Sequence, residues 1–225
     1  MTQWTYNDRP AGARFLSDRI PEPGRTAIED ELWAWVVRGE SDADEFVDFF
    51  DDDDDERCGA TDDELRAAHE TALGVRREQQ REWGEVRGNL TRAFVELNAL
   101  GVLARENFSC CGTCASAEID DERDDSRHWR GFLWYHQQDT ESLLASEDGE
   151  VYLGYGVYPP ADFDEASYAG LSEAEQQASY QADLERLLDE VAFPVLRKHG
   201  MQVEWNRKQS RRIKVTGAQW YAPLN

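Results

Sequence analysis

The chain has 225 residues and a formal charge of −23, because 47 acidic side chains face only 24 Lys and Arg. A surface of this charge repels nucleic-acid backbones and anionic membranes, which argues against nonspecific binding to either. Hydrophobic residues make up 40% of the sequence and eight residues are Trp, so we expect a buried core rather than a disordered chain.

The N-terminal residues have neither the basic region nor the apolar run of a secretory signal. No apolar segment approaches the ~18 residues that a membrane-spanning helix needs. We therefore expect a cytoplasmic protein with no membrane span. In that compartment the cysteines are expected to be thiols, metal ligands or redox centres before they are structural disulfides.

The first hundred residues are predicted to be irregular at first and then helical. Residues 1–25 are rich in Pro and Gly and show little periodicity, which is typical of an irregular lead-in. Residues 26–100 form the predicted helical segment. In it, Ser/Thr-x-x-Glu capping boxes at Thr26 and Thr61 each begin an amphipathic helix.

Six consecutive acidic residues, 51–56, interrupt this helical segment. The run lacks the alternating ligands, the central Gly and the final Glu of an EF-hand loop, so it does not indicate a calcium site. Blocks of like charge are typical of solvated loops. The alternative is an acidic interaction module, residues 42–56, that binds a basic protein partner.

The hydrophobic period changes at residue 101, where a predicted α+β domain, 101–225, begins. Its predicted strands are rich in aromatic and β-branched residues, and they span 102–108, 131–136, 151–158, 201–205 and 213–216. A long helix with a capping box at Ser172 precedes the last two strands. The order is β-α-β-β-α-β plus an extra C-terminal strand, which predicts a ferredoxin-like antiparallel sheet with two helices on one face.

Three of the four cysteines lie together in the string Cys110-Cys-Gly-Thr-Cys114. Thiolates at this spacing can face one metal ion, and tetrahedral Zn²⁺ accepts a set of three cysteines and one histidine. His136 follows the next predicted strand and is the expected fourth ligand, while Asp139 can support it or supply an oxygen. The candidate metal ligands are therefore Cys110, Cys111, Cys114 and His136, with zinc as the expected cofactor.

The same residues allow other interpretations. Cys111 and Cys114, after a strand and at a helix start, are placed like a thioredoxin-type redox pair, although the terminal hairpin departs from that fold. His136 and Asp139 can form a catalytic acid–base pair, or Asp139 can cap a helix. The thiols can also simply pack near the sheet. Since no P-loop, Gly-x-Ser-x-Gly or His-Glu-x-x-His motif accompanies them, the sequence favours a non-catalytic role.

One basic group stands out in the acidic chain, and its members are Arg197, Lys198, Arg207, Lys208, Arg211, Arg212 and Lys214. On a hairpin, such a group can bind phosphate or nucleic acid. The overall charge favours the simpler interpretation that these side chains neutralise acidic segments of the same chain. The sequence does not indicate an oligomeric state.

Several strings resemble an uncharacterised family of bacterial, mainly actinobacterial, domains. They are Phe108-Ser-Cys-Cys-Gly-Thr-Cys114, His136-Gln-Gln-Asp-Thr140 and Leu153-Gly-Tyr-Gly156, within a resemblance that covers roughly Thr61 to Trp220. Members often carry Gly after the third cysteine, where this chain has Ala115. The resemblance implies a cytoplasmic bacterial protein and a single domain over that region, and it carries no activity.

Overall fold

The computed structural model describes residues 5–50, 57–83, 86–161 and 163–224. The chain divides into two compact units: unit 1 is Met1–Val86 with Tyr221–Asn225, and unit 2 is Arg87–Trp220. The predicted domain boundary at residue 101 lies one helix later in the chain than this division. The helix that precedes residue 101, Asn89–Ala99, packs on the first strand of unit 2 and therefore belongs to that unit. None of the helices within the described ranges is long and apolar enough to cross a membrane.

Unit 1 contains three helices in its described part: α1 (Gly24–Val37), α2 (Ala43–Phe49) and α3 (Asp62–Trp83). Residues 5–23 are irregular, as predicted. The capping box at Thr61 is confirmed, since its backbone N–H donates to Glu64 Oε2 at 2.9 Å and its Oγ1 accepts the Glu64 N–H. The prediction of a capping box at Thr26 is wrong. α1 begins two residues earlier, after Pro23, whose ring restricts φ, and the Thr26 hydroxyl donates to Glu22.

The core of unit 1 joins the apolar faces of its three helices. Leu32 of α1, Phe46 of α2 and Leu65 of α3 are fully buried in it. A buried arginine, Arg76, lies beside this core, with its guanidinium 4.9 Å from the ring centroid of Tyr221. Tyr221, one of the C-terminal residues of unit 1, therefore supplies a cation–π contact to a charge removed from water. The acidic run 51–56 lies outside the described residues, and its binding of a basic partner stays a prediction.

His69 gives unit 1 an expected pH dependence. The ring is fully buried on α3 and lies 5.6 Å, centroid to centroid, from Phe46. Burial lowers the pKa of His69, against smaller opposing effects of the Glu40 backbone and of Asp42 and Glu70. The folded unit therefore keeps the ring neutral at a pH where the unfolded chain binds a proton.

We expect the free energy of unfolding of unit 1 to fall as the pH drops below about 6.5, by up to about 1.4 kcal/mol per pH unit. His69→Leu should flatten this slope between pH 7 and pH 5, as measured by urea denaturation at each pH. His128→Gln, which replaces an exposed histidine of unit 2, should leave the slope unchanged. An identical slope in His69→Leu and the parent chain would contradict the assignment.

Unit 2 is the α+β part of the chain. Its strands are β1 (Val102–Arg105), β2 (Gly131–Trp134), β3 (Val151–Val157), β4 (Gln202–Glu204) and β5 (Ile213–Thr216). Its helices are α4 (Asn89–Ala99), α5 (Gly112–Glu118), α6 (Gln137–Ala145), α7 (Glu165–Ala169), α8 (Glu173–Leu187) and α9 (Phe193–Lys198). A 3₁₀ turn, Ile119–Glu122, follows α5, and a π-helical turn, Leu188–Ala192, joins α8 to α9. The capping box predicted at Ser172 is confirmed at the start of α8.

The described strands form one five-stranded sheet in the order β1-β2-β3-β5-β4. The predicted β4–β5 hairpin is confirmed. The prediction of a purely antiparallel sheet is wrong, because β1 and β2 are parallel, with Val102 opposite Gly131. The connection between them contains α5 and is long enough to return the chain to the same end of the sheet, as a parallel pair requires. The α+β class holds, and the ferredoxin-like arrangement is not confirmed.

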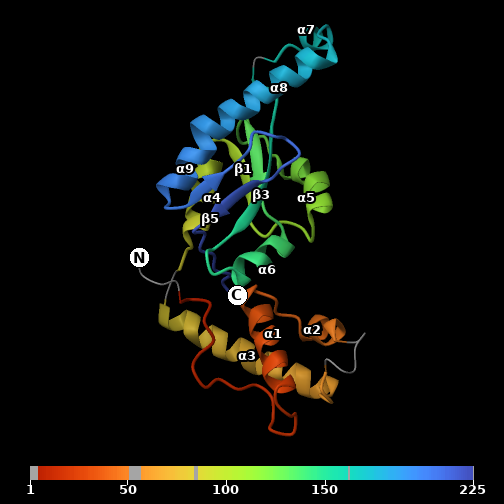
Figure 1. Ribbon diagram of the computed structural model, residues 1–225, viewed down its shortest axis with the longest axis vertical. Coiled ribbons are helices and arrows are strands. Elements are labelled where there is room, and N and C mark those ends of the chain that lie inside the picture. The colour runs from red at the N-terminus through yellow and green to blue at the C-terminus, as the bar shows by residue number, and fades with distance from the viewer. Residues whose placement is uncertain (1–4, 51–56, 84–85, 162, 225) are drawn as a thin grey trace. The chain divides into compact units, whose positions relative to one another are not determined.

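Helices lie on both faces of the sheet. α4, α8 and α9 lie on one side and α5 lies on the other (Figure 1). On the α5 side, Ala115 and Ile119 pack against Leu103 of β1 and Trp134 of β2. Trp134 is opposite Gly154 in the antiparallel β2–β3 pair, so its ring can cross the neighbouring strand without meeting a side chain. The start of α5 is thereby held beside the end of β2.

Candidate functional site

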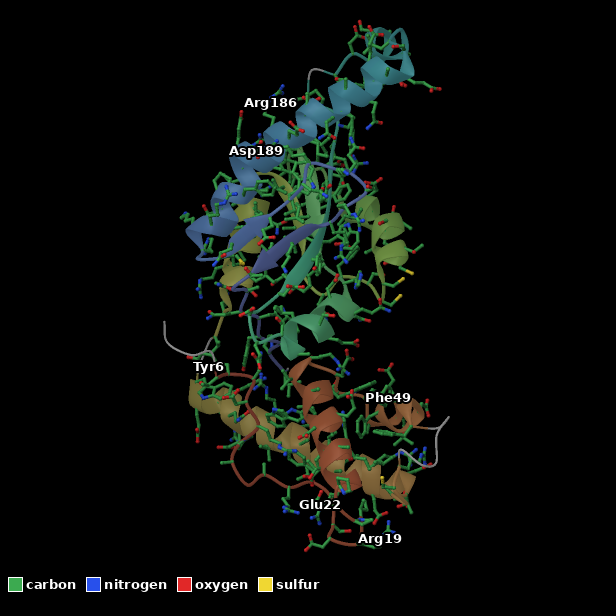
Figure 2. All side chains as sticks on the ribbon, viewed as in Figure 1. Tyr6, Arg19, Glu22, Phe49, Arg186 and Asp189 are labelled. Atoms are coloured by element: carbon green, nitrogen blue, oxygen red, sulfur yellow. The ribbon has the colours of Figure 1, made fainter. Side chains whose placement is uncertain are left out.

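The three clustered cysteines lie just before α5 and in its first turn. Cys110 is exposed, whereas Cys111 and Cys114 are half-buried. The Sγ atoms of all three lie within 4.8 Å of one another, and Figure 2 shows sulfur atoms in yellow beside α5. In a tetrahedral zinc site with Zn–S bonds of about 2.3 Å, neighbouring sulfurs are about 3.8 Å apart. The three thiols are thus within about 1 Å of the separation that one metal ion needs.

A local turn brings the adjacent cysteines together. Ser109 adopts a φ of 62°, and Cys111, the residue before α5, is extended with a φ of −152°. The turn is fixed to the segment after β2, since the Phe108 N–H donates to the Tyr135 oxygen at 2.8 Å. The Gln137 N–H likewise donates to the Ser109 oxygen at 3.1 Å. The cysteine loop and the residues on either side of His136 are therefore joined through the backbone.

The thiols of the cluster differ in acidity. The N–H of Cys114, then its thiol and the N–H of Thr113, lower the pKa of Cys111. The neighbouring thiols of Cys110 and Cys111 raise the pKa of Cys114 to about 11. The thiol of Cys111 therefore ionises more readily than that of Cys114.

His136 and Asp139 form the capping box of α6. The Asp139 N–H donates to Nδ1 of His136 at 3.2 Å, and the His136 N–H donates to Oδ2 of Asp139 at 3.0 Å. Both residues are 7% exposed. Burial lowers the pKa of His136; Asp139 opposes this effect and Arg212 adds to it. The imidazole is consequently held in its neutral state.

The ring of His136 lies against the cysteine loop at Gly112. A Cβ at position 112 would lie 3.5 Å from Nε2 of His136. Among the described residues, the group of ligand atoms that are all within 4.8 Å of one another comprises the three cysteines. His136 therefore adjoins the cluster through Gly112, and its Nε2 lies 3.4 Å from Nη1 of Arg212.

Arg212 is the residue of this site that the sequence interpretation missed. It lies just before β5, and its two terminal nitrogens donate to the two carboxylate oxygens of Asp139, with Nη1 2.9 Å from Oδ1. Its guanidinium also lies 5.1 Å from the ring centroid of Trp134. A bidentate arginine fixes the plane of the Asp139 carboxylate, which in turn fixes the His136 ring.

Other members of the basic group also pair with acids of the same unit. Lys198 lies 2.7 Å from Glu96, Arg207 lies 2.9 Å from Asp189, and Lys214 pairs with Glu150. These ion pairs fit the interpretation that the basic side chains neutralise acidic segments of the chain itself.

The fold and the cysteine cluster define an α+β protein with a candidate site for a metal ion that prefers sulfur ligands. The chain belongs to the family described as a domain of unknown function, DUF6891, which matches residues 21–223. The resemblance to an uncharacterised domain family is thereby confirmed. No curated protein and no solved structure matches the chain.

Proposed function

We propose that this DUF6891 protein is a bacterial, cytoplasmic metal-binding protein whose metal site has a structural or regulatory role rather than a catalytic one. Cys110, Cys111 and Cys114 hold one ion, with zinc as the first candidate, and His136 completes a closed four-ligand set. The convergence of the three Sγ atoms within 4.8 Å carries the proposal. A closed set of this kind leaves no open position for a substrate.

The surroundings of His136 support its part in the proposal. Coordination through Nε2 requires the proton to be on Nδ1. Nδ1 lies 3.2 Å from Oδ2 of Asp139, so that carboxylate can accept a hydrogen bond from the Nδ1–H in a carboxylate–histidine–metal arrangement. In this tautomer Nδ1 of His136 no longer accepts the hydrogen bond from the Asp139 N–H. The guanidinium of Arg212 must also move away from Nε2 to make room for the metal ion. Binding therefore exchanges one capping bond for a metal bond.

Purified protein is expected to contain about one zinc per chain, with thiols that react slowly with a disulfide reagent until a chelator removes the metal. Cys114→Ser should abolish stoichiometric zinc, because a hydroxyl does not replace a thiolate ligand. Cys58→Ser is the matched control, since Cys58 belongs to unit 1 and not to the cluster. Metal analysis and thiol titration are the measurements. Equal zinc content in the two variants would contradict the proposal.

The alternative function uses Cys111 and Cys114 as a redox dithiol, and their short Sγ–Sγ separation favours it. In that reaction one S–S bond forms between them, two protons leave, and two electrons reduce a disulfide of the substrate to two thiols. A metal-free protein in which Cys111 reacts quickly and a Cys111–Cys114 disulfide forms reversibly would favour this function over zinc binding.

A further inference from the structure

A cavity of about 530 Å³ lies between the end of β3, α7 and the middle of α8. Its size is within the range of small-molecule pockets. It shares no lining residue with the cysteine cluster. Both α7 and the start of α8 extend beyond the end of the sheet in Figure 1. The described residues that give the cavity its character are four aromatic and two acidic ones: Tyr158, Phe163, Tyr168, Tyr180, Asp164 and Asp183.

Contacts within the chain position the part of the aromatic wall that Phe163 and Tyr168 form. The rings of Phe163 and Tyr168 lie 5.1 Å apart. The Tyr168 hydroxyl donates to the Gln176 carbonyl at 3.3 Å, and the Gln176 amide donates back to the Tyr168 carbonyl at 3.1 Å. These reciprocal bonds hold α7 against α8. A ligand therefore does not have to order this part of the wall on binding.

The wall also presents apolar surface to solvent. Phe163 and Leu171 both line the cavity, and they are 39% and 38% exposed. Large apolar side chains that gather at a concave site indicate a ligand with an apolar body.

The charges around the cavity are unevenly distributed. Among its described lining residues the charged ones are Asp164 and Asp183, and none is Lys or Arg. The hydroxyl and N–H of Ser167, with the N–H of Ala166, lower the pKa of Asp164, so this carboxylate is ionised at neutral pH. Asp183 lies 3.0 Å from Arg186, which is labelled on α8 in Figure 2.

Basic side chains gather instead in a neighbouring cavity of about 300 Å³, which is lined by His128, Arg130 and Arg186. The two cavities share four lining residues: Val157, Tyr158, Pro160 and Asp183. Because Arg186 pairs with Asp183, the charge that the described lining residues of the larger cavity offer to a ligand is the Asp164 carboxylate, and its combination with aromatic faces attracts cations.

We propose that the cavity between β3, α7 and α8 binds a small organic cation with an apolar body, such as a substituted ammonium ion. The cationic group lies against the aromatic faces and is attracted by the carboxylate of Asp164, while Asp183 stays paired with Arg186. The apolar body covers Phe163 and Leu171. A compact metal cation would have to give up its hydration shell to reach these aromatic walls, and an anionic ligand would meet the Asp164 carboxylate.

Calorimetric titration with benzyltrimethylammonium chloride tests the proposal, and sodium benzylsulfonate is the comparator, because it has the same aromatic body and the opposite charge. We expect the cation to bind and the anion to bind at least about tenfold more weakly. No binding of the cation at about 10 mM, or equal binding of the two compounds, would overturn the proposal.

Two variants test whether the cation binds in this cavity. Asp164→Asn keeps an N-cap for α7 but removes the charge, and Tyr180→Leu removes one aromatic face. Each is expected to weaken the binding of benzyltrimethylammonium by about three- to tenfold. The matched controls are Asp42→Asn, which changes the corresponding N-cap of α2, and Tyr152→Leu, an exposed tyrosine outside the cavity. Losses of equal size in the controls would show that the cation binds elsewhere.

Discussion

Gly131→Ala is expected to lower the free energy of unfolding of unit 2 by about 3 kcal/mol. A Cβ at position 131 would overlap the carbonyl oxygen of Gly156 and Cδ2 of Leu187, and it would lie 3.1 Å from the Cα of Val157. Two of these atoms belong to the backbone of β3, which is paired with β2, so they cannot move by a side-chain rotation. The clash therefore has to be relieved by separating the strands or displacing α8.

Gly112→Ala is the matched control within the same unit. The nearest atom to a Cβ at position 112 lies at 3.5 Å, which is an ordinary contact, so we expect a change within about 0.5 kcal/mol. Hydrogen exchange of the β2 and β3 amides under increasing denaturant measures unit 2 separately from unit 1. Equal protection in the two variants would show that the close approach of α8 to β2 is not required for stability.

The elements that could be predicted from the sequence are those with local signals. The capping boxes at Thr61 and Ser172 join residues three positions apart, and the β4–β5 hairpin joins neighbouring strands. Strand pairing across a long connection has no such signal. The parallel β1–β2 pair depends on how α5 returns the chain, and the assignment of α4 to the sheet depends on its packing against β1.

The candidate site was predictable to a similar extent. The string Cys110-Cys-Gly-Thr-Cys114 predicted that the sulfurs of its three cysteines converge, and the structure brings all three within 4.8 Å of one another. The spacing from His136 to Asp139 is also that of a capping box, with histidine in place of serine or threonine, and this signal was present in the sequence. Arg212 could not be predicted as a partner, because it lies 73 positions from Asp139 and only the fold brings them together.

Asp139→Ala is expected to lower the free energy of unfolding of unit 2 by about 2–4 kcal/mol. The variant removes the carboxylate that accepts the His136 N–H at 3.0 Å and both terminal nitrogens of Arg212. It leaves a guanidinium beside Trp134 without its acid partner, in a position where only a third of the Arg212 side chain is exposed. Removing one member of a largely buried pair costs more than the pair contributes, since the remaining charge stays desolvated.

The pairing of Asp139 with Arg212 predicts how second variants behave. Asp139→Asn keeps an acceptor for the His136 N–H and should cost about half as much as Asp139→Ala. Arg212→Met combined with Asp139→Ala should cost less than the sum of the single changes, by about 1–2 kcal/mol, because no unpaired charge remains. The single variant Asp139→Ala and the double variant should also bind zinc about 10- to 100-fold more weakly than the parent chain if Asp139 orients His136 as a ligand. Additive losses of stability would show that the two side chains act independently, and unchanged zinc affinity would show that Asp139 does not orient His136 as a ligand.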